Sequence, residues 1–200
     1  MIRKVFRVAI VIVAVMFVHQ AKAQDVAFGL KGGVNLTNLK VSDAQGTYDS
    51  RTGYHAGVFL RGKFNKVGIQ PEVLLFTQSN KIDYGSLGTV KQSFTYLSIP
   101  VMLKFYPVGG LNIQAGPQFG FLLDGQRKYD NGFVTSTQNI KDYYKSSDVS
   151  VSVGAGYDFG FGLGLDVRYN LGIQDINAAS NNEKVKSQVF LVSVGWNFLK

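Results

Sequence analysis

Hydrophobic and polar residues alternate along most of the chain after residue 24, with the period of two that a β-strand with two different faces produces. In the stretch FGLGLDVRYNLG, residues 161–172, one face is aromatic or aliphatic and the other carries glycine, Asp166, Arg168 and Asn170. We find no helical period of 3.6 in this region. The alternation predicts eight strands, over residues 26–36, 53–64, 67–78, 92–105, 111–123, 148–159, 161–172 and 187–199.

The connections between these predicted strands alternate in length. The short ones are residues 65–66, residues 106–110 and the turn around Gly160, and the long, polar ones are residues 37–52, 79–91, 124–147 and 173–186. Predicted strands of about 11 residues or more also match the length that a tilted strand needs to cross a bilayer. Long extracellular loops alternating with short periplasmic turns are typical of outer-membrane barrels.

The two faces of the strands then indicate which side meets lipid. A soluble barrel would turn its polar face to water and fill it with Lys, Glu and Thr, whereas here that face is rich in glycine, which suits a small, crowded interior. We therefore expect an all-β fold, an eight-stranded antiparallel up-and-down transmembrane β-barrel, with the apolar face toward lipid. Aromatic residues at the predicted periplasmic ends would form an interfacial girdle: Phe64, Phe105, Tyr106, Tyr157, Phe159, Phe161, Trp196 and Phe198.

The N-terminus has the pattern of a secretory signal peptide. Positive residues precede an apolar run over residues 8–18, which ends in Ala21-Lys22-Ala23. That run is too short for a transmembrane anchor. We expect residues 1–23 to be cleaved, leaving a barrel domain over residues 24–200 in the cell outer membrane. Cleavage would remove four positive charges, Arg3, Lys4, Arg7 and Lys22, so the formal net charge of +8 would fall to +4.

Several charged residues fall on the predicted inward face. An eight-stranded barrel has room only for its own side chains, so we expect these charges to pair with one another and close the lumen. In particular, Glu72 should bond Arg61, Arg168 or both. The alternative interpretation of these charges is an ion path. The predicted lumen charge network is Lys31, Arg61, Lys63, Glu72, Lys104, Asp166 and Arg168, with Asp158 on the same face.

The longest predicted loop, residues 124–147, combines basic and aromatic residues: Arg127, Lys128, Tyr129, Phe133, Tyr143 and Tyr144. Exposed aromatic and basic side chains suit an extracellular glycan or protein partner. The alternatives are a loop without a partner and an extracellular extension of the strands. Besides this loop, the expected partners are outer-membrane lipid and other envelope proteins. Nucleic acid is not expected, since no basic module is present.

The sequence offers little for catalysis. His55 is the one histidine outside the expected signal peptide. Asp49 and Ser50 lie near it in sequence, a combination that a hydrolase or acyltransferase could use. Closeness in sequence, however, does not supply the three-residue geometry that catalysis needs. The glycines of residues 154–164 lack the helix and the Lys-Ser/Thr of a phosphate-binding loop. With no cysteine in the chain, thiolate sites are excluded. We expect no enzyme activity and no catalytic, cofactor-binding or metal-binding residues.

An ordered set of short strings resembles the PorT-like outer-membrane β-barrel family of Gram-negative bacteria. The strings are FGLKGGVNLTNL (28–39), GYHAGVFL (53–60), QPEVLLF (70–76), TYLSIPVMLKFYP (95–107), NIQAGPQFGFLLDG (112–125) and GLDVRYNLGI (164–173). The resemblance implies a small, porin-like barrel, with some relatives tied to secretion machinery. The residues favour a structural or recognition role through the extracellular loops. A narrow porin-like channel, a secretion-associated component and a lipid-modifying enzyme are the alternatives.

Overall fold

The computed structural model describes residues 25–41, 47–83, 89–130, 135–141, 147–173 and 185–199. The expected signal peptide and three loop residues, Phe133, Tyr143 and Tyr144, lie outside this part. The described strands are β1 (Asp25–Val41), β2 (Thr47–Phe64), β3 (Val67–Asp83), β4 (Thr89–Phe105), β5 (Leu111–Asp130), β6 (Thr135–Asn139), β7 (Ser147–Asp158), β8 (Leu163–Gly172) and β9 (Val185–Leu199). No helix within the described ranges is long and apolar enough to cross a membrane.

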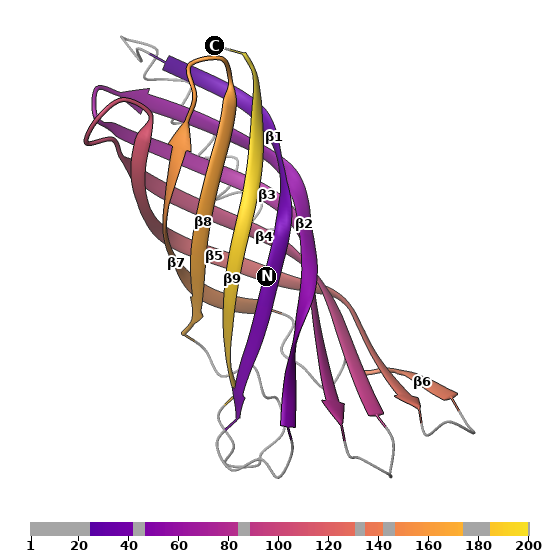
Figure 1. Ribbon diagram of the computed structural model, residues 1–200. Helices are drawn as coiled ribbons and strands as arrows, with labels where there is room; N and C mark the ends of the chain where they lie inside the picture. Colours follow the sequence, from indigo (N-terminus) through magenta and orange to yellow (C-terminus); the bar gives the residue numbers. More distant parts are fainter. Residues whose placement is uncertain are drawn as a thin grey trace.

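Eight of the described strands form a closed antiparallel barrel, as the alternation predicted. Their order is β4-β3-β2-β1-β9-β8-β7-β5, and pairing of β4 with β5 completes the ring. The first and last described strands are neighbours, from Phe28 beside Leu199 to Val41 beside Val185. Figure 1 shows these strands steeply inclined and wrapped around one axis, with β6 outside the ring.

Three tight turns join strands at the end of the barrel that carries the C-terminus, the upper end in Figure 1. Asn65 adopts a φ of 53°, a left-handed conformation that Asn tolerates better than most residues, and Phe64 pairs with Val67 across it. Gly109 and Gly162, with φ of 54° and 108°, provide the same freedom in the other two turns. Turn chemistry that can be recognised in the sequence therefore sets the register of three hairpins.

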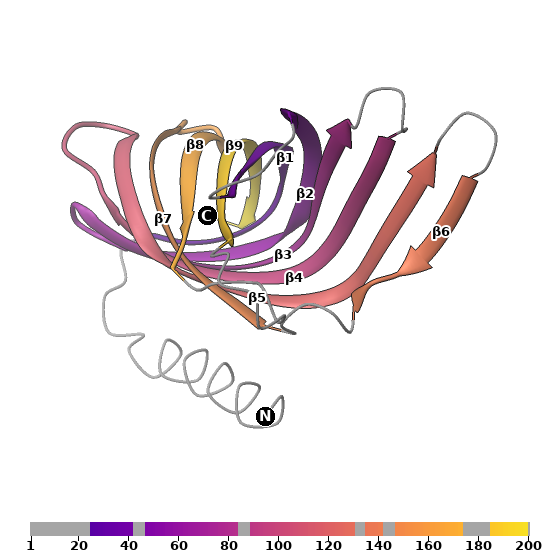
Figure 2. The same ribbon diagram turned by 90° about the horizontal axis from the view of Figure 1, so that it is seen from below.

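At the opposite end, several strands run further than predicted. The interpretation of residues 124–147 as a loop is wrong for much of its length, because β5 continues to Asp130 and β6 follows it. Residues 126–130 pair with β4 along one edge and with β6 along the other. We call residues 79–83, 89–93 and 126–130, together with β6, the extension. Figure 2 shows its strands continuing past the barrel as a curved sheet.

The outward face of the barrel is apolar and the inward face is largely polar. Leu165, Val167 and Val194 are more than 40% exposed, whereas the neighbouring inward Asp166 and Ser193 are buried. Tyr157, Phe159, Phe161 and Trp196 form a continuous chain of ring contacts near the short turns, with centroids 4.7, 5.3 and 6.4 Å apart. The expected rim residues Phe64, Phe105 and Phe198 are also exposed. An aromatic girdle therefore lies at this end.

Two inward glycines show why that face tolerates so few side chains. A Cβ added to Gly57 would run into the carbonyl oxygen of Val73 on β3, and one added to Gly116 would run into that of Val101 on β4. At these positions the neighbouring backbone occupies the space that a side chain would need. The close approach belongs to the sharp curvature of a small barrel.

Candidate functional site

The centre of the lumen is organised around Glu72 of β3, which is 1% exposed. Arg168 of β8 donates to both carboxylate oxygens, through Nη1 at 2.8 Å and Nη2 at 2.6 Å. Lys31 of β1 donates to Oε1 at 3.2 Å, and Gln70 donates to the same atom at 2.7 Å. Of the two partners expected for Glu72, the structure has Arg168 and not Arg61. The Glu72 carboxylate therefore joins strands from three parts of the ring.

A second carboxylate, Asp166 of β8, extends this cluster. Its Oδ2 lies 2.7 Å from Lys31 Nζ, and its Oδ1 lies 2.9 Å from Arg168 Nε, the latter an ion pair without hydrogen-bond geometry. Lys31 and Arg168 thus each face both acids. Removing one member would leave an uncompensated charge in a buried site.

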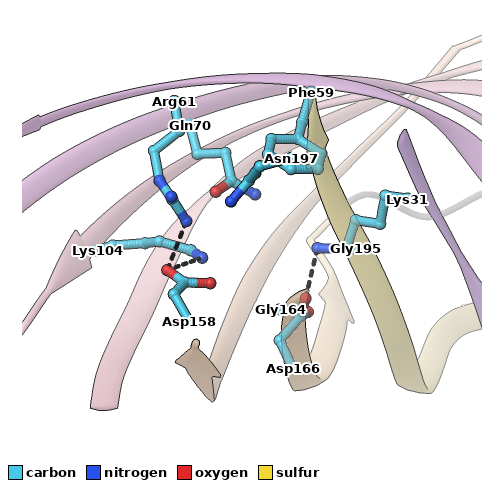
Figure 3. A pocket seen from close by; sticks show the side chains of 10 residues that line it. All are labelled: Lys31, Phe59, Arg61, Gln70, Lys104, Asp158, Gly164, Asp166, Gly195 and Asn197. Atoms are coloured by element: carbon cyan, nitrogen blue, oxygen red, sulfur yellow. Dashed lines mark hydrogen bonds and ion pairs between the residues drawn. The ribbon is translucent and has the colours of Figure 1, made fainter. Parts of the chain in front are cut away.

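Arg61 pairs with Asp158, nearer the short turns. Arg61 Nη1 lies 2.7 Å and Lys104 Nζ lies 3.3 Å from Asp158 Oδ2, as Figure 3 shows. The expected contact of Arg61 with Glu72 is replaced because Arg168, Lys31 and Gln70 already occupy the Glu72 oxygens.

Tyr106 departs from its expected place in the aromatic girdle. It is 3% exposed, and its hydroxyl donates to Asp158 at 2.7 Å. Burial, together with the neighbouring Asp158, raises the pKa of Tyr106 above its usual range, so the hydroxyl stays protonated and keeps donating. Lys63 does not join the ion pairs of the described lumen, and its Nζ lies 4.2 Å from the centre of the Tyr106 ring.

The charged layer leaves little free space. A cavity of about 10 Å³ is lined by residues of seven strands, among them Lys31, Arg61 and Asp166, and Figure 3 shows their side chains converging on it. That is room for about one water molecule. Gln70 Oε1 and Asn197 Oδ1 lack hydrogen-bond partners among the described residues and line the same cavity.

Neutral polar side chains form the next layer toward the long loops. Ser152 donates to Asn170 at 2.6 Å, and Asn170 donates to Gln118 at 2.9 Å. His55 Nε2 lies 2.9 Å from Ser193 Oγ, and its ring stacks on Phe76 with centroids 6.1 Å apart. His55 Nδ1 has no hydrogen-bond partner in the described part of the chain.

Beyond this layer the lumen holds an apolar cluster that the sequence interpretation missed. Its members are all under 9% exposed: Phe76, Phe94, Tyr96, Leu122, Ile140, Val189 and Leu191. Ile140 follows β6 and is held by a bond from its backbone nitrogen to the Gly125 oxygen, 2.9 Å long. The available signal was the loss of alternation, since Leu75 and Phe76, like Leu122 and Leu123, are apolar on both faces.

The three expected recognition residues that the structure describes, Arg127, Lys128 and Tyr129, do not share one face of β5. Arg127 lies on the same side of β5 as Tyr129. With the Gln92 amide oxygen oriented toward Arg127, the guanidinium Nη2 and Nε donate to that oxygen at 3.0 and 3.2 Å. Lys128 lies on the other side, beside Lys91. Because a strand alternates sides, residues adjacent in sequence are separated by the sheet.

Comparisons with known proteins agree with this architecture. Residues 20–178 match the family model described as outer membrane protein beta-barrel domain. Neisserial surface protein A is 15% identical, with a TM-score of 0.52, covering 88% of this chain and 100% of that one. No curated protein sequence matches significantly.

Two other solved structures match with lower TM-scores. Ail of Yersinia pestis, solved in complex with the heparin analogue sucrose octasulfate, is 14% identical with a TM-score of 0.49, over 88% of this chain and 100% of that one. OprG of Pseudomonas aeruginosa is 16% identical with a TM-score of 0.47, over 87% and 96%.

Proposed function

The chain belongs to the family of outer membrane protein β-barrel domains and lies in the cell outer membrane, and from this premise we propose that it is a closed barrel serving recognition at the cell surface. In this proposal the barrel is a rigid support, and the extension is the part that meets a partner. Transport and catalysis are not its role.

The filled lumen is the observation that carries the proposal. Three layers follow one another along the axis: ion pairs around Glu72 and Asp158, neutral hydrogen bonds around Asn170, and the apolar cluster that includes Ile140. Ions passing this route would have to break buried ion pairs and cross a desolvated apolar layer, and both steps are costly. These layers support a structural role for the interior charges over an ion path.

The extension supports the recognition part of the proposal. β5 is 20 residues long, twice the length of β8, so paired strand continues well beyond the barrel on one side. Its exposed residues include Lys128 and Tyr129 of β5 and Thr137 of β6. A paired sheet holds such side chains in place, which lowers the entropy lost on binding a glycan or a protein.

The surroundings of His55 support a non-enzymatic role. A hydrolytic set needs a nucleophile, a base and a group that orients the base. Ser193 and His55 are in contact deep in the lumen, but no described residue bonds His55 Nδ1, and the apolar cluster lies beyond them.

The resemblance to PorT-like barrels supports a narrower version of the proposal, in which the partner is another envelope protein associated with secretion. The PorT-like assignment itself is part of this proposal. A partner of this kind would contact the extension or the short turns.

The closed lumen is tested by recording wild-type protein in planar bilayers, with insertion verified by a heat-modifiable band from the same preparation. We expect no steady ion conductance, because the three layers leave no continuous water path. Steady, concentration-independent unitary currents would overturn the closed lumen and favour the porin-like channel.

Recognition is tested in intact cells by a photo-crosslinking amino acid at Thr137, with the exposed Val108 in a short turn as the matched control. Protein or glycan adducts at position 137 that are absent at position 108 would support it. Absence of adducts at 137, with the protein present at the surface, would contradict it.

A further inference from the structure

The strand register places lysines beside one another across the extension. Lys91 of β4 pairs with Lys128 of β5. We call these two residues the lysine row. Lys91 is in phase with the outward Leu97 and Leu103 of β4, so the row occupies the outer side of the wall.

Such a row is unfavourable by itself. Like charges directly opposite each other on neighbouring strands destabilise a sheet. Within the described residues, neither Lys91 nor Lys128 forms an ion pair. Asp124, which lies opposite Thr95 between the row and the apolar belt, accepts a hydrogen bond from Gln126 at 3.0 Å. The row therefore lacks a matching row of acids on its membrane side.

We propose that the lysine row binds phosphate groups on the headgroup of an outer-leaflet glycolipid. The row continues the surface that faces lipid: on β5, the exposed Leu123 precedes Lys128 by five residues, and a shift of register between Leu122 and Asp124 keeps both on the outward side. Between the apolar belt and the row, the outward positions carry polar side chains suited to sugars, namely Thr77, Ser79, Ser93, Thr95, Asp124 and Gln126.

The spacing favours a large saccharide headgroup over that of a simple phospholipid. Five residues of strand at about 3.4 Å each, inclined by about 40°, rise about 13 Å beyond the apolar boundary. An ordinary headgroup layer is only about 5 to 8 Å thick. A phosphorylated sugar headgroup reaches this height.

The test compares wild-type protein with the double variant Lys91→Gln/Lys128→Gln. Diphosphorylated lipid A is titrated into each protein in neutral detergent, and the bound fraction is measured by native mass spectrometry. Two cations near an anionic lipid surface predict roughly a 30-fold loss of affinity in the double variant. The variant Lys91→Arg/Lys128→Arg should bind like wild type. The matched control Lys66→Gln/Lys141→Gln, with the same loss of charge elsewhere, should also bind like wild type.

A stability comparison in neutral detergent separates a binding defect from misfolding. Without lipid A, Lys91→Gln/Lys128→Gln should unfold at an equal or higher temperature than wild type, because the repulsion across the pair is gone. With lipid A the order should reverse.

Three results would overturn the proposal. One is equal lipid A affinity of wild type and the double variant, and another is equal binding of dephosphorylated lipid A. The third is inositol hexakisphosphate binding as tightly as lipid A, which would indicate a site for soluble polyanions. None of these results depends on whether the lumen conducts, so this inference and the proposed function can fail separately.

Discussion

At the scale of single residues, Glu72 shows how one buried group can determine the interior. Its two oxygens take bonds from Arg168, Lys31 and Gln70, which come from β8, β1 and β3. The alternative, well-packed apolar side chains, is often at least as stable as a buried ion pair. What the ion pairs add is a geometric requirement, because Arg168 and Lys31 neutralise Glu72 only when β8 and β1 bring them within bonding distance of it.

Glu72→Gln keeps the shape of the side chain and removes its charge, which leaves Arg168 and Lys31 facing a neutral amide. We expect a loss of about 3 to 5 kcal/mol in the free energy of unfolding, measured by urea titration in lipid vesicles. The exposed-face control Asp124→Asn should change it by less than about 0.5 kcal/mol. Equal stability of Glu72→Gln and wild type would show that the network is not tightly coupled.

At the scale of strands, glycine positions report how closely neighbouring backbones approach. Gly116→Ala would press its Cβ against the Val101 carbonyl, so we expect a loss of about 1 to 3 kcal/mol. Gly62→Ala is the matched control, because nothing lies within 4 Å of its added Cβ. It should be neutral or stabilise by up to about 1 kcal/mol. Both are measured by the same urea titration, and an opposite order of the two variants would reject the close approach.

The same scale explains what the sequence could and could not predict. Strand existence, inward and outward faces and the turn at Asn65 followed from alternation and turn chemistry. The extension was only one of several open interpretations, because residues 126–130, QRKYD, are polar on both faces and their pairing depends on distant partners in β4 and β6. The apolar cluster was missed because its strand segments are apolar on both faces, so the alternation of apolar and polar residues that identifies an inward face is absent there. The pairing of Arg61 with Asp158 could not be predicted from the sequence, because the two residues are far apart in the chain and meet only inside the folded barrel.

At the scale of the whole molecule, the outward belt decides insertion into the membrane. Val167 lies between Ala155 and Val192 near the middle of the wall, whereas Leu165 lies beside the girdle residue Tyr157. Val167→Arg should therefore cost about 2 to 4 kcal/mol of stability in bilayers. Leu111→Arg, at the rim beside Tyr157, should cost about 1 kcal/mol or less. Vesicle refolding measures both, and equal costs would mean that the belt is not centred where the register puts it.

The pairing of β1 with β9 makes the first and last described strands each other's neighbours. The ring therefore keeps an open edge until β9 pairs with β1, and the ion pair between Lys31 of β1 and Asp166 of β8 spans that seam. Closure of the ring and neutralisation of its interior are thus coupled, and we expect a chain truncated before Val185 to leave Lys31 and Asp166 unpaired with each other.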